Sequence, residues 1–107
     1  MFYKKNKSKY RVAREGVRFK SLACGEKTHL TEFRLSKGAV IPKHSHPHEQ
    51  TGYLVSGRMK FTIEDETFIA EAGDGWSIAG NTEHGVDVFE DCVVVEVFSP
   101  PRKDYLP

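Results

Sequence analysis

The sequence predicts an all-β protein built as a small antiparallel barrel, and three observations support this prediction. Apolar and polar residues alternate with a period of two, whereas helical periodicity is nearly absent. Turn-forming residues recur at intervals of about ten residues. The chain has 107 residues, so we expect one domain over residues 1–107, and a barrel removes exposed sheet edges most economically.

Each expected strand follows from alternation, and each expected boundary follows from a turn signal. The inward positions of the clearest strands are Thr31, Phe33 and Leu35; Met59, Phe61 and Ile63; and Val86 and Val88. The predicted turns lie at Cys24–Glu26, Lys37–Gly38, Ser56–Gly57, Glu64–Glu66, Ala72–Gly75, Gly80–Asn81 and Glu90–Asp91. Pro100 and Pro101 end the last strand because proline cannot donate to a sheet, and we expect the tail to lie across the surface.

Charge and composition restrict the partners and the compartment. Residues 1–20 carry eight Lys or Arg against one Glu, which predicts a solvated arm or a basic lip that attracts acidic substrates or RNA, although no RNA-binding motif supports the latter. Within it, residues 1–10 are expected to be mobile or exchanged with a partner chain. The net charge of +1 argues against nucleic-acid binding, and no apolar run is long enough to cross a membrane.

The start of the chain and the two cysteines predict a cytoplasmic protein. Residues 1–7 lack the apolar stretch of a signal peptide. Cys24 and Cys92 are the two cysteines, and we interpret them as reduced thiols, with a disulfide between them left open.

Histidines provide the strongest chemical signal. Three of the five histidines lie within residues 44–48. His44 and His46 are two positions apart, so a strand would present both on one face, and His84 is expected on a neighbouring antiparallel strand. Three imidazoles and the amide oxygen of Gln50 can hold a divalent first-row metal ion with positions left open, as catalytic sites require. The alternative is a surface histidine run without a functional metal.

These residues lie in two motifs that resemble those of the cupin superfamily. The first is Gly38-X5-His44-X-His46-X3-Gln50-X6-Gly57, with Gln where most members have Glu, and the second is Gly73-X5-Ala79-X-Asn81-X2-His84. In the second, Ala79 replaces the usual Pro, Asn81 a common Gly, and Val88 the terminal Asn. The resemblance covers residues 38–88 and implies a double-stranded β-helix, or jelly-roll barrel. It also implies one divalent metal ion (Ni, Fe, Mn, Zn or Co) with ligands at His44, His46, Gln50 and His84.

The chain is further similar to the small pectin-degradation cupins through residues 44–50, 52–58 and 98–106. That similarity implies conversion of 4,5-unsaturated uronates to their linear keto forms, a small acidic sugar as substrate and a homodimer. The family's acidic residue, Phe and Arg fall on Glu96, Phe98 and Arg102, with Glu96 where Asp is more common.

The residues themselves leave two interpretations of Glu96 and of Arg102. Val94, Glu96 and Phe98 share one strand face, so an inward Glu96 would be a costly buried carboxyl and a candidate proton carrier. Alternatively, Glu96 faces solvent or pairs with an arginine in a dimer. Arg102 suits a substrate carboxylate because guanidinium binds it bidentately, or it is a surface arginine of a charged tail.

The remaining candidates receive structural interpretations. We expect His48 to support a ligand or line the pocket, Glu49 to be solvated, and His29 to be an ordinary strand-end residue. Tyr53 and Trp76 are expected to fill the core.

The leading hypothesis is a metal-dependent, isomerase-like enzyme in which Glu96 moves a proton and Arg102 binds the substrate carboxylate. The alternatives are an iron-dependent dioxygenase and a non-catalytic cupin that binds a small molecule.

Overall fold

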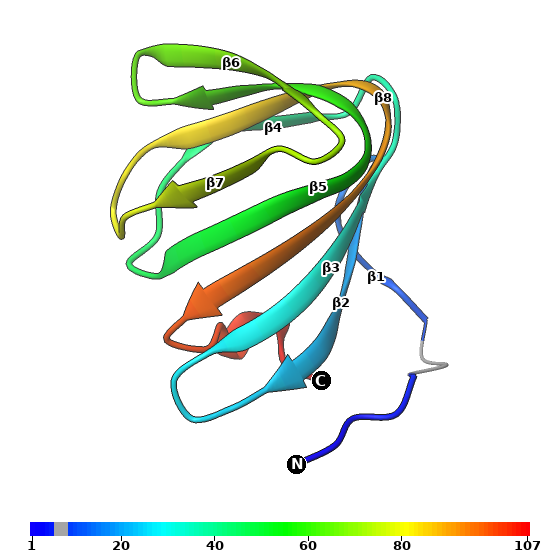
Figure 1. Ribbon diagram of the computed structural model, residues 1–107, viewed down its shortest axis with the longest axis vertical. Helices are drawn as coiled ribbons and strands as arrows, with labels where there is room; N and C mark the ends of the chain where they lie inside the picture. The colour runs from blue at the N-terminus through cyan, green and yellow to red at the C-terminus, as the bar shows by residue number, and fades with distance from the viewer. Residues whose placement is uncertain (6–8) are drawn as a thin grey trace.

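Nearly all of the regular structure is β-strand in the computed structural model, which describes residues 1–5 and 9–107 (Figure 1). The strands are β1 (Arg11–Arg14), β2 (Val17–Cys24), β3 (His29–Leu35), β4 (Val40–His44), β5 (Glu49–Ile63), β6 (Glu66–Glu71), β7 (Gly75–Ile78) and β8 (His84–Ser99). A short 3-10 helix, η1 (Lys103–Tyr105), follows them. Every strand pair in the described residues is antiparallel, so the all-β prediction is confirmed.

The two longest strands, β5 and β8, join two sheets into one barrel. The second half of β8 pairs with β3 and with the first half of β5. The first half of β8 pairs with β4 and with the second half of β5. Strands β1, β2 and β7 extend the first sheet, and β6 extends the second. Figure 1 shows β5 and β8 bending together, which produces the predicted jelly-roll arrangement.

Two of the predicted turns are wrong because they lie inside these long strands. Ser56–Gly57 belongs to β5 and Glu90–Asp91 belongs to β8, and the two positions face each other where the register shifts. Gly57 has φ +99°, and a Cβ there would overlap the carbonyl oxygen of Asp91. The turn-forming residues therefore make a bulge, which bends a strand without ending it. The other predicted turns lie between strands or at their ends.

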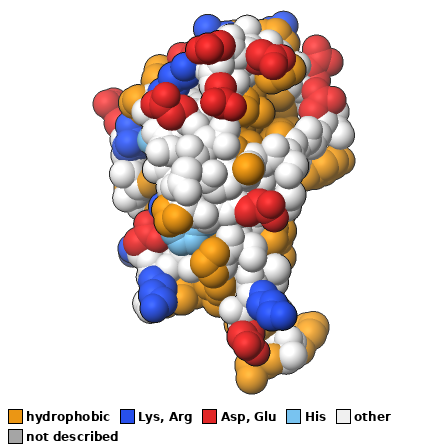
Figure 2. Space-filling view, turned by 90° about the vertical axis from the view of Figure 1, so that its left-hand side faces the viewer, with side chains coloured by type: hydrophobic (Ala, Val, Ile, Leu, Met, Phe, Trp, Pro, Cys, Tyr) orange, Lys and Arg blue, Asp and Glu red, His pale blue; other side chains and the backbone are white. Residues whose placement is uncertain are grey.

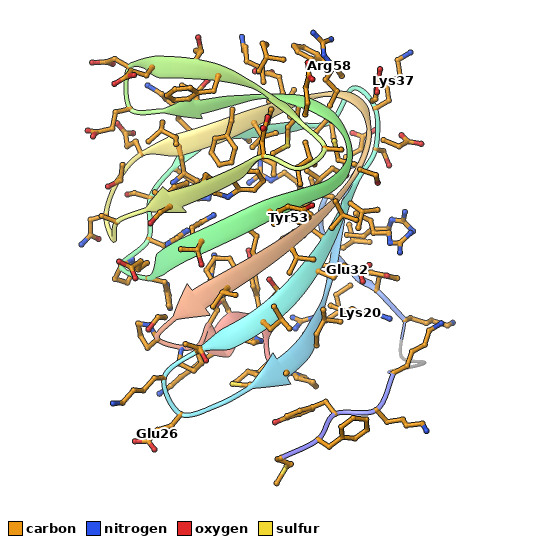
Figure 3. All side chains as sticks on the ribbon, viewed as in Figure 1. Lys20, Glu26, Glu32, Lys37, Tyr53 and Arg58 are labelled. Carbon is orange, nitrogen blue, oxygen red and sulfur yellow. The ribbon has the colours of Figure 1, made fainter. Side chains whose placement is uncertain are left out.

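The barrel core follows the predicted alternation. Its buried apolar residues include Val17, Phe19, Phe33, Leu35, Leu54, Met59, Phe61, Val86, Val88, Val94 and Phe98. Trp76 packs against this cluster, with its ring 4.9 Å from that of Phe61. The core role expected of Tyr53 is wrong: its side chain is 50% exposed on the outer face of β5 (Figure 3), because the neighbouring Leu54 takes the inward position.

The ends of the chain lie beside the first sheet. The expectation for residues 1–10 falls partly on residues 6–8, which lie outside the described residues; Tyr3 donates a hydrogen bond to the carbonyl oxygen of Cys24, at 2.9 Å. At the other end, Tyr105 packs on the core, so the tail covers the barrel interior as well as its surface. Both cysteines are free thiols. The described chain contains no helix of the length and apolarity that a membrane crossing needs.

Candidate active site

Three imidazoles from two strands and a loop converge at one end of the barrel. His44 ends β4 and His84 begins β8, and the two residues are paired in register. The ring centroid of His84 lies 4.4 Å from that of His44 and 5.0 Å from that of His46. One ligand atom from each residue lies within 4.8 Å of the others. This cluster can hold a metal ion.

The hydrogen bonds of these rings fix the tautomer of their neutral form. In each of the three imidazoles, Nδ1 contacts a backbone carbonyl oxygen two residues away along the chain. The partners of His44, His46 and His84 are Pro42 at 3.0 Å, His48 at 3.0 Å and Thr82 at 2.8 Å. A carbonyl oxygen only accepts, so each Nδ1 carries a proton, and in the neutral form of the ring Nε2 keeps a lone pair for a ligand. Histidines that bind a metal ion usually donate their other ring N–H to a carbonyl or carboxylate oxygen in this way.

Burial keeps two of the rings neutral. The pKa of His46 is lowered to about 4, chiefly by burial and then by the charge of Arg102. Burial also lowers the pKa of His84. Neutral rings at pH 7 bind a metal ion without first releasing a proton.

His46 reaches the cluster from a loop, so the expectation that one strand presents both His44 and His46 is wrong. β4 ends at His44, and the backbone N–H of Asn81 donates to the carbonyl oxygen of His46 at 2.7 Å. A Cβ at Gly80 would overlap the carbonyl oxygen of Pro47. The Gly80–Asn81 turn therefore holds the histidine loop in place.

Gln50 lies beside the histidines on β5. Its side chain is 5% exposed, between the register partners Phe98 and Ile78. Its Oε1 is buried and has no hydrogen-bond partner among the described residues. Such an acceptor is costly to bury alone, so the donor set of three Nε2 atoms and this oxygen fits a bound cation.

Glu96 faces the barrel interior, and the solvent-facing alternative is wrong. Its side chain is 6% exposed, and Trp76 Nε1 donates to its Oε1 at 3.1 Å. Its Oε2 has no partner in the described part of the chain. Burial raises the pKa of Glu96 to about 8, against the hydrogen bonds from Trp76 and Gln50, which lower it. The carboxyl is therefore protonated at pH 7.

Arg102 lies in the pocket wall rather than on the open surface. Its side chain is 13% exposed, and its guanidinium lies 4.0 Å from the ring centroid of Tyr105 and 5.1 Å from that of Phe98. Asp104 forms an ion pair with it at 2.9 Å. The positive charge of Arg102 lowers the pKa values of His46 and His84, so the guanidinium lies close enough to interact electrostatically with both rings.

Comparisons with known proteins place the chain in a family. The cupin domain family matches residues 31–98, which contain both motifs. The chain is a cupin. The pectin degradation protein KdgF of Dickeya dadantii (strain 3937) is 31% identical over 94 residues, which is 86% of each chain. The predicted resemblance to the pectin-degradation cupins is thereby confirmed.

Solved structures agree with this membership. KdgF from Halomonas sp. has a TM-score of 0.91 at 29% identity, covering 99% of this cupin and 98% of that chain. An RmlC-like cupin from Shewanella frigidimarina NCIMB 400 also has a TM-score of 0.91, at 22% identity over 98% and 95% of the two chains. The polyketide cyclase RemF from Streptomyces resistomycificus has a TM-score of 0.84 at 21% identity, over 96% and 82%. The last two show the fold alone.

The cupin's site opens into a pocket of about 410 Å³. Its polar lining consists mainly of His44, His46, Gln50, His84, Glu96, Arg102 and Asp104, above apolar core residues. Arg11 and Arg14 of β1 also line it, so three arginines surround the pocket against one ionised acid, Asp104. Figure 2 shows histidine beside apolar side chains on one face, while acidic side chains gather near the upper end of that face. The pocket therefore favours an anionic ligand.

Other sequence expectations take different places in the cupin. His48 lies beside the ring of His46, at 5.6 Å between centroids, and supports it through its carbonyl oxygen without lining the pocket. Glu49 is exposed, as expected.

Trp76 has a role that sequence reasoning missed, because it binds Glu96 as well as packing on the core. The glycine at position 52 is the sequence feature that goes with this role. Gly52 is the register partner of Trp76, and a Cβ there would overlap the indole. The stacking of Tyr105 on Arg102 could not be predicted from alternation, because Tyr105 lies beyond the last strand.

Proposed function

We propose that the cupin binds one divalent transition-metal ion through Nε2 of His44, His46 and His84, with Oε1 of Gln50 as a fourth ligand. The convergence of three imidazoles beside an unpartnered buried oxygen supports this proposal. All four ligands are uncharged, so the ion keeps its full charge and attracts an anionic substrate. Ni, Fe, Mn, Zn and Co all suit this donor set.

We further propose that the cupin converts 4,5-unsaturated uronates, the products of polysaccharide lyases acting on pectin or alginate, to their linear keto forms. The similarity to KdgF, a pectin degradation protein, supports the substrate class. The pocket supports the reaction because it combines a cation, a protonated carboxyl and a metal-binding cluster.

In the proposed reaction, each residue has one task. Arg102 binds the substrate carboxylate, while Tyr105 and Asp104 hold its guanidinium in place. A bound divalent ion supplies Lewis-acid polarisation of a substrate oxygen.

Glu96 carries the proton in this scheme. When the cyclic substrate opens, the C1–O5 bond breaks, the anomeric hydroxyl loses its proton as the C1 aldehyde forms, and O5 gains a proton as an enol hydroxyl at C5. The neutral carboxyl of Glu96 then protonates C4, and the enol hydroxyl loses its proton as the C5 ketone forms, so the overall conversion is an isomerisation. Trp76 fixes the Oε1 side of the carboxyl and leaves Oε2 toward the substrate.

The test is to follow the loss of ultraviolet absorbance of unsaturated galacturonate with metal-loaded protein, with chelated protein and without protein. We expect metal-loaded protein to exceed the spontaneous rate and chelation to remove the excess. Glu49→Gln, a change of the same type at an exposed carboxylate, is the matched control for Glu96→Gln. A metal-loaded rate equal to the spontaneous one contradicts the proposal.

Homodimer formation and a cytoplasmic location stay predictions. Light scattering tests the first and cell fractionation the second.

A further inference from the structure

His29 is buried in a way that an ordinary strand-end residue does not require. It begins β3, its exposed fraction is 0%, and it lies on the inward face together with Thr31. Both of its ring nitrogens have partners. Nε2 lies 2.7 Å from Oγ of Ser21 on β2, and Nδ1 accepts a hydrogen bond from the backbone N–H of Arg102 at 3.2 Å.

These two contacts fix the tautomer of His29. A backbone N–H can only donate, so Nδ1 carries no proton, and the neutral ring must carry its proton on Nε2. Nε2 therefore donates to Oγ of Ser21. This is the reverse of the three site histidines, whose Nδ1 atoms donate to backbone carbonyl oxygens. His29 is thus built as a structural acceptor rather than as a metal ligand.

The contact falls where the chain leaves the last strand and enters the tail. Ser99 Oγ donates to the carbonyl oxygen of Lys27 at 2.7 Å, and the carbonyl oxygen of Arg102 accepts from the N–H of Tyr105 at 3.0 Å. The N–H of Arg102 is the group between these two anchors, and His29 binds it from 73 residues away. The backbone at Arg102 therefore has a fixed place relative to the sheet that carries Glu96.

We infer that His29 is a positioning residue: paired with Ser21, it fixes the backbone of Arg102 so that the guanidinium meets the carboxylate of an anionic substrate. The inference rests on the proposed function, in which Arg102 binds that carboxylate. Burial lowers the pKa of His29, and the charge of Arg102 lowers it further, so the ring stays in the neutral form that accepts. A misplaced guanidinium weakens substrate binding, whereas Glu96 and the histidine cluster stay where they are.

Two amide substitutions separate this role from simple packing. His29→Asn places an oxygen where Nδ1 stood and can still accept from Arg102. His29→Gln places its amide where Nε2 stood and leaves the Arg102 N–H without an acceptor. We expect KM for unsaturated galacturonate to rise about tenfold in His29→Gln with kcat nearly unchanged, and His29→Asn to stay near the wild type. Leu54→Ala, at a fully buried side chain that does not line the pocket, controls for loss of stability.

Amide hydrogen exchange at Arg102 gives a second measurement that does not need catalysis. We expect this N–H to exchange slowly in the wild type and His29→Asn and faster in His29→Gln, without a change in Leu54→Ala. Equal exchange at Arg102 in the two amide variants, or a loss of kcat at constant KM in His29→Gln, overturns the inference. If the wild type does not accelerate ketonisation, the proposed function fails. The exchange measurement, with binding of saturated galacturonate by calorimetry in place of KM, then decides the role of His29.

Discussion

The two walls of the pocket are built by different means. The histidine wall consists of His44, His46 and His84, and each ring is held by a carbonyl oxygen two residues away. The anion wall consists of Glu96 and Arg102, which are held by Trp76 from 20 residues away and by His29 from 73 residues away. Short segments can therefore orient each ring of the first wall before strand pairing brings the rings together, whereas in the second wall even the orientation of the side chains depends on distant residues.

The walls also differ in charge. The histidine wall offers imidazoles, two of which have pKa values lowered by burial, and suits a cation, whereas the anion wall holds a protonated carboxyl and a guanidinium. If this division is correct, changes in the histidine wall remove the metal and the activity together. Changes in the anion wall leave the metal bound and reduce catalysis or substrate binding alone.

The largest expected effect comes from the histidine wall. We predict that His84→Ala reduces the metal content from about one ion per chain to near zero and returns ketonisation to its spontaneous rate, because a pair of imidazoles holds a divalent ion weakly. Elemental analysis and the absorbance assay measure both. His48→Ala is the matched control, because it keeps the backbone carbonyl that accepts from His46 and removes an imidazole outside the three-ring cluster. Full metal content in His84→Ala would contradict the assignment.

The next effect separates the walls. We predict that Glu96→Gln lowers kcat by about 10²- to 10⁴-fold, the range expected for loss of a general acid, while the metal content stays at the wild-type value. Steady-state kinetics and elemental analysis of the same preparation test this. Loss of the metal in Glu96→Gln would show that the two walls are not independent.

A smaller effect is expected at the cation. We predict that Arg102→Lys raises KM about 10- to 100-fold with kcat reduced only a few-fold, because lysine cannot bind a carboxylate bidentately or stack on Tyr105 in the same way. Lys103→Arg, at an exposed neighbour, serves as the control. An unchanged KM would remove Arg102 from substrate binding.

The same contrast explains how much the sequence predicts. The small antiparallel barrel follows from the alternation, whereas the jelly-roll fold and the approach of His84 to His44 follow from the resemblance of the two motifs to those of cupins. The direction of Glu96 did not follow, because alternation places Glu96 with Val94 and Phe98 without saying which face is buried. The role of His29 could not be predicted, because its partner Arg102 lies in the tail, where no periodic pattern exists.

The turn predictions failed for a related reason. Gly57 and Asp91 carry the residue types of turns, yet β5 and β8 continue through them as a paired bulge. Residues typical of turns indicate an unusual local backbone conformation. Whether that conformation ends the strand in a turn or bends it in a bulge depends on the strand with which it pairs. Tyr53 shows the same limit, because neighbouring residues of a strand face opposite sides of the sheet, so a shift of one position turns a buried aromatic into an exposed one.

The smallest expected effect is on stability, and it concerns the anion wall without its metal. The pKa of Glu96 is about 8 in the folded chain, chiefly because of burial, against 4.5 as its ordinary value. Between these pH values the folded state keeps a proton that the unfolded state has lost, so the free energy of unfolding falls as the pH rises and levels off above about 8.

Urea denaturation in chelator at pH 5 to 8.5, compared between the wild type and Glu96→Gln, isolates this contribution. The buried His46 and His84 titrate in both proteins, so their effect cancels in the difference. We expect the wild type to lose stability relative to Glu96→Gln as the pH rises. A difference that is constant with pH would contradict the raised pKa.

The most direct test of the account is anomalous diffraction from crystals of the zinc-loaded protein. We predict one fully occupied peak in the pocket, about 2.0–2.1 Å from Nε2 of His44, His46 and His84, with Oε1 of Gln50 turned toward it. A peak bound through Nδ1, a peak elsewhere on the protein, or none in the pocket would contradict the convergence of the three rings on one ion.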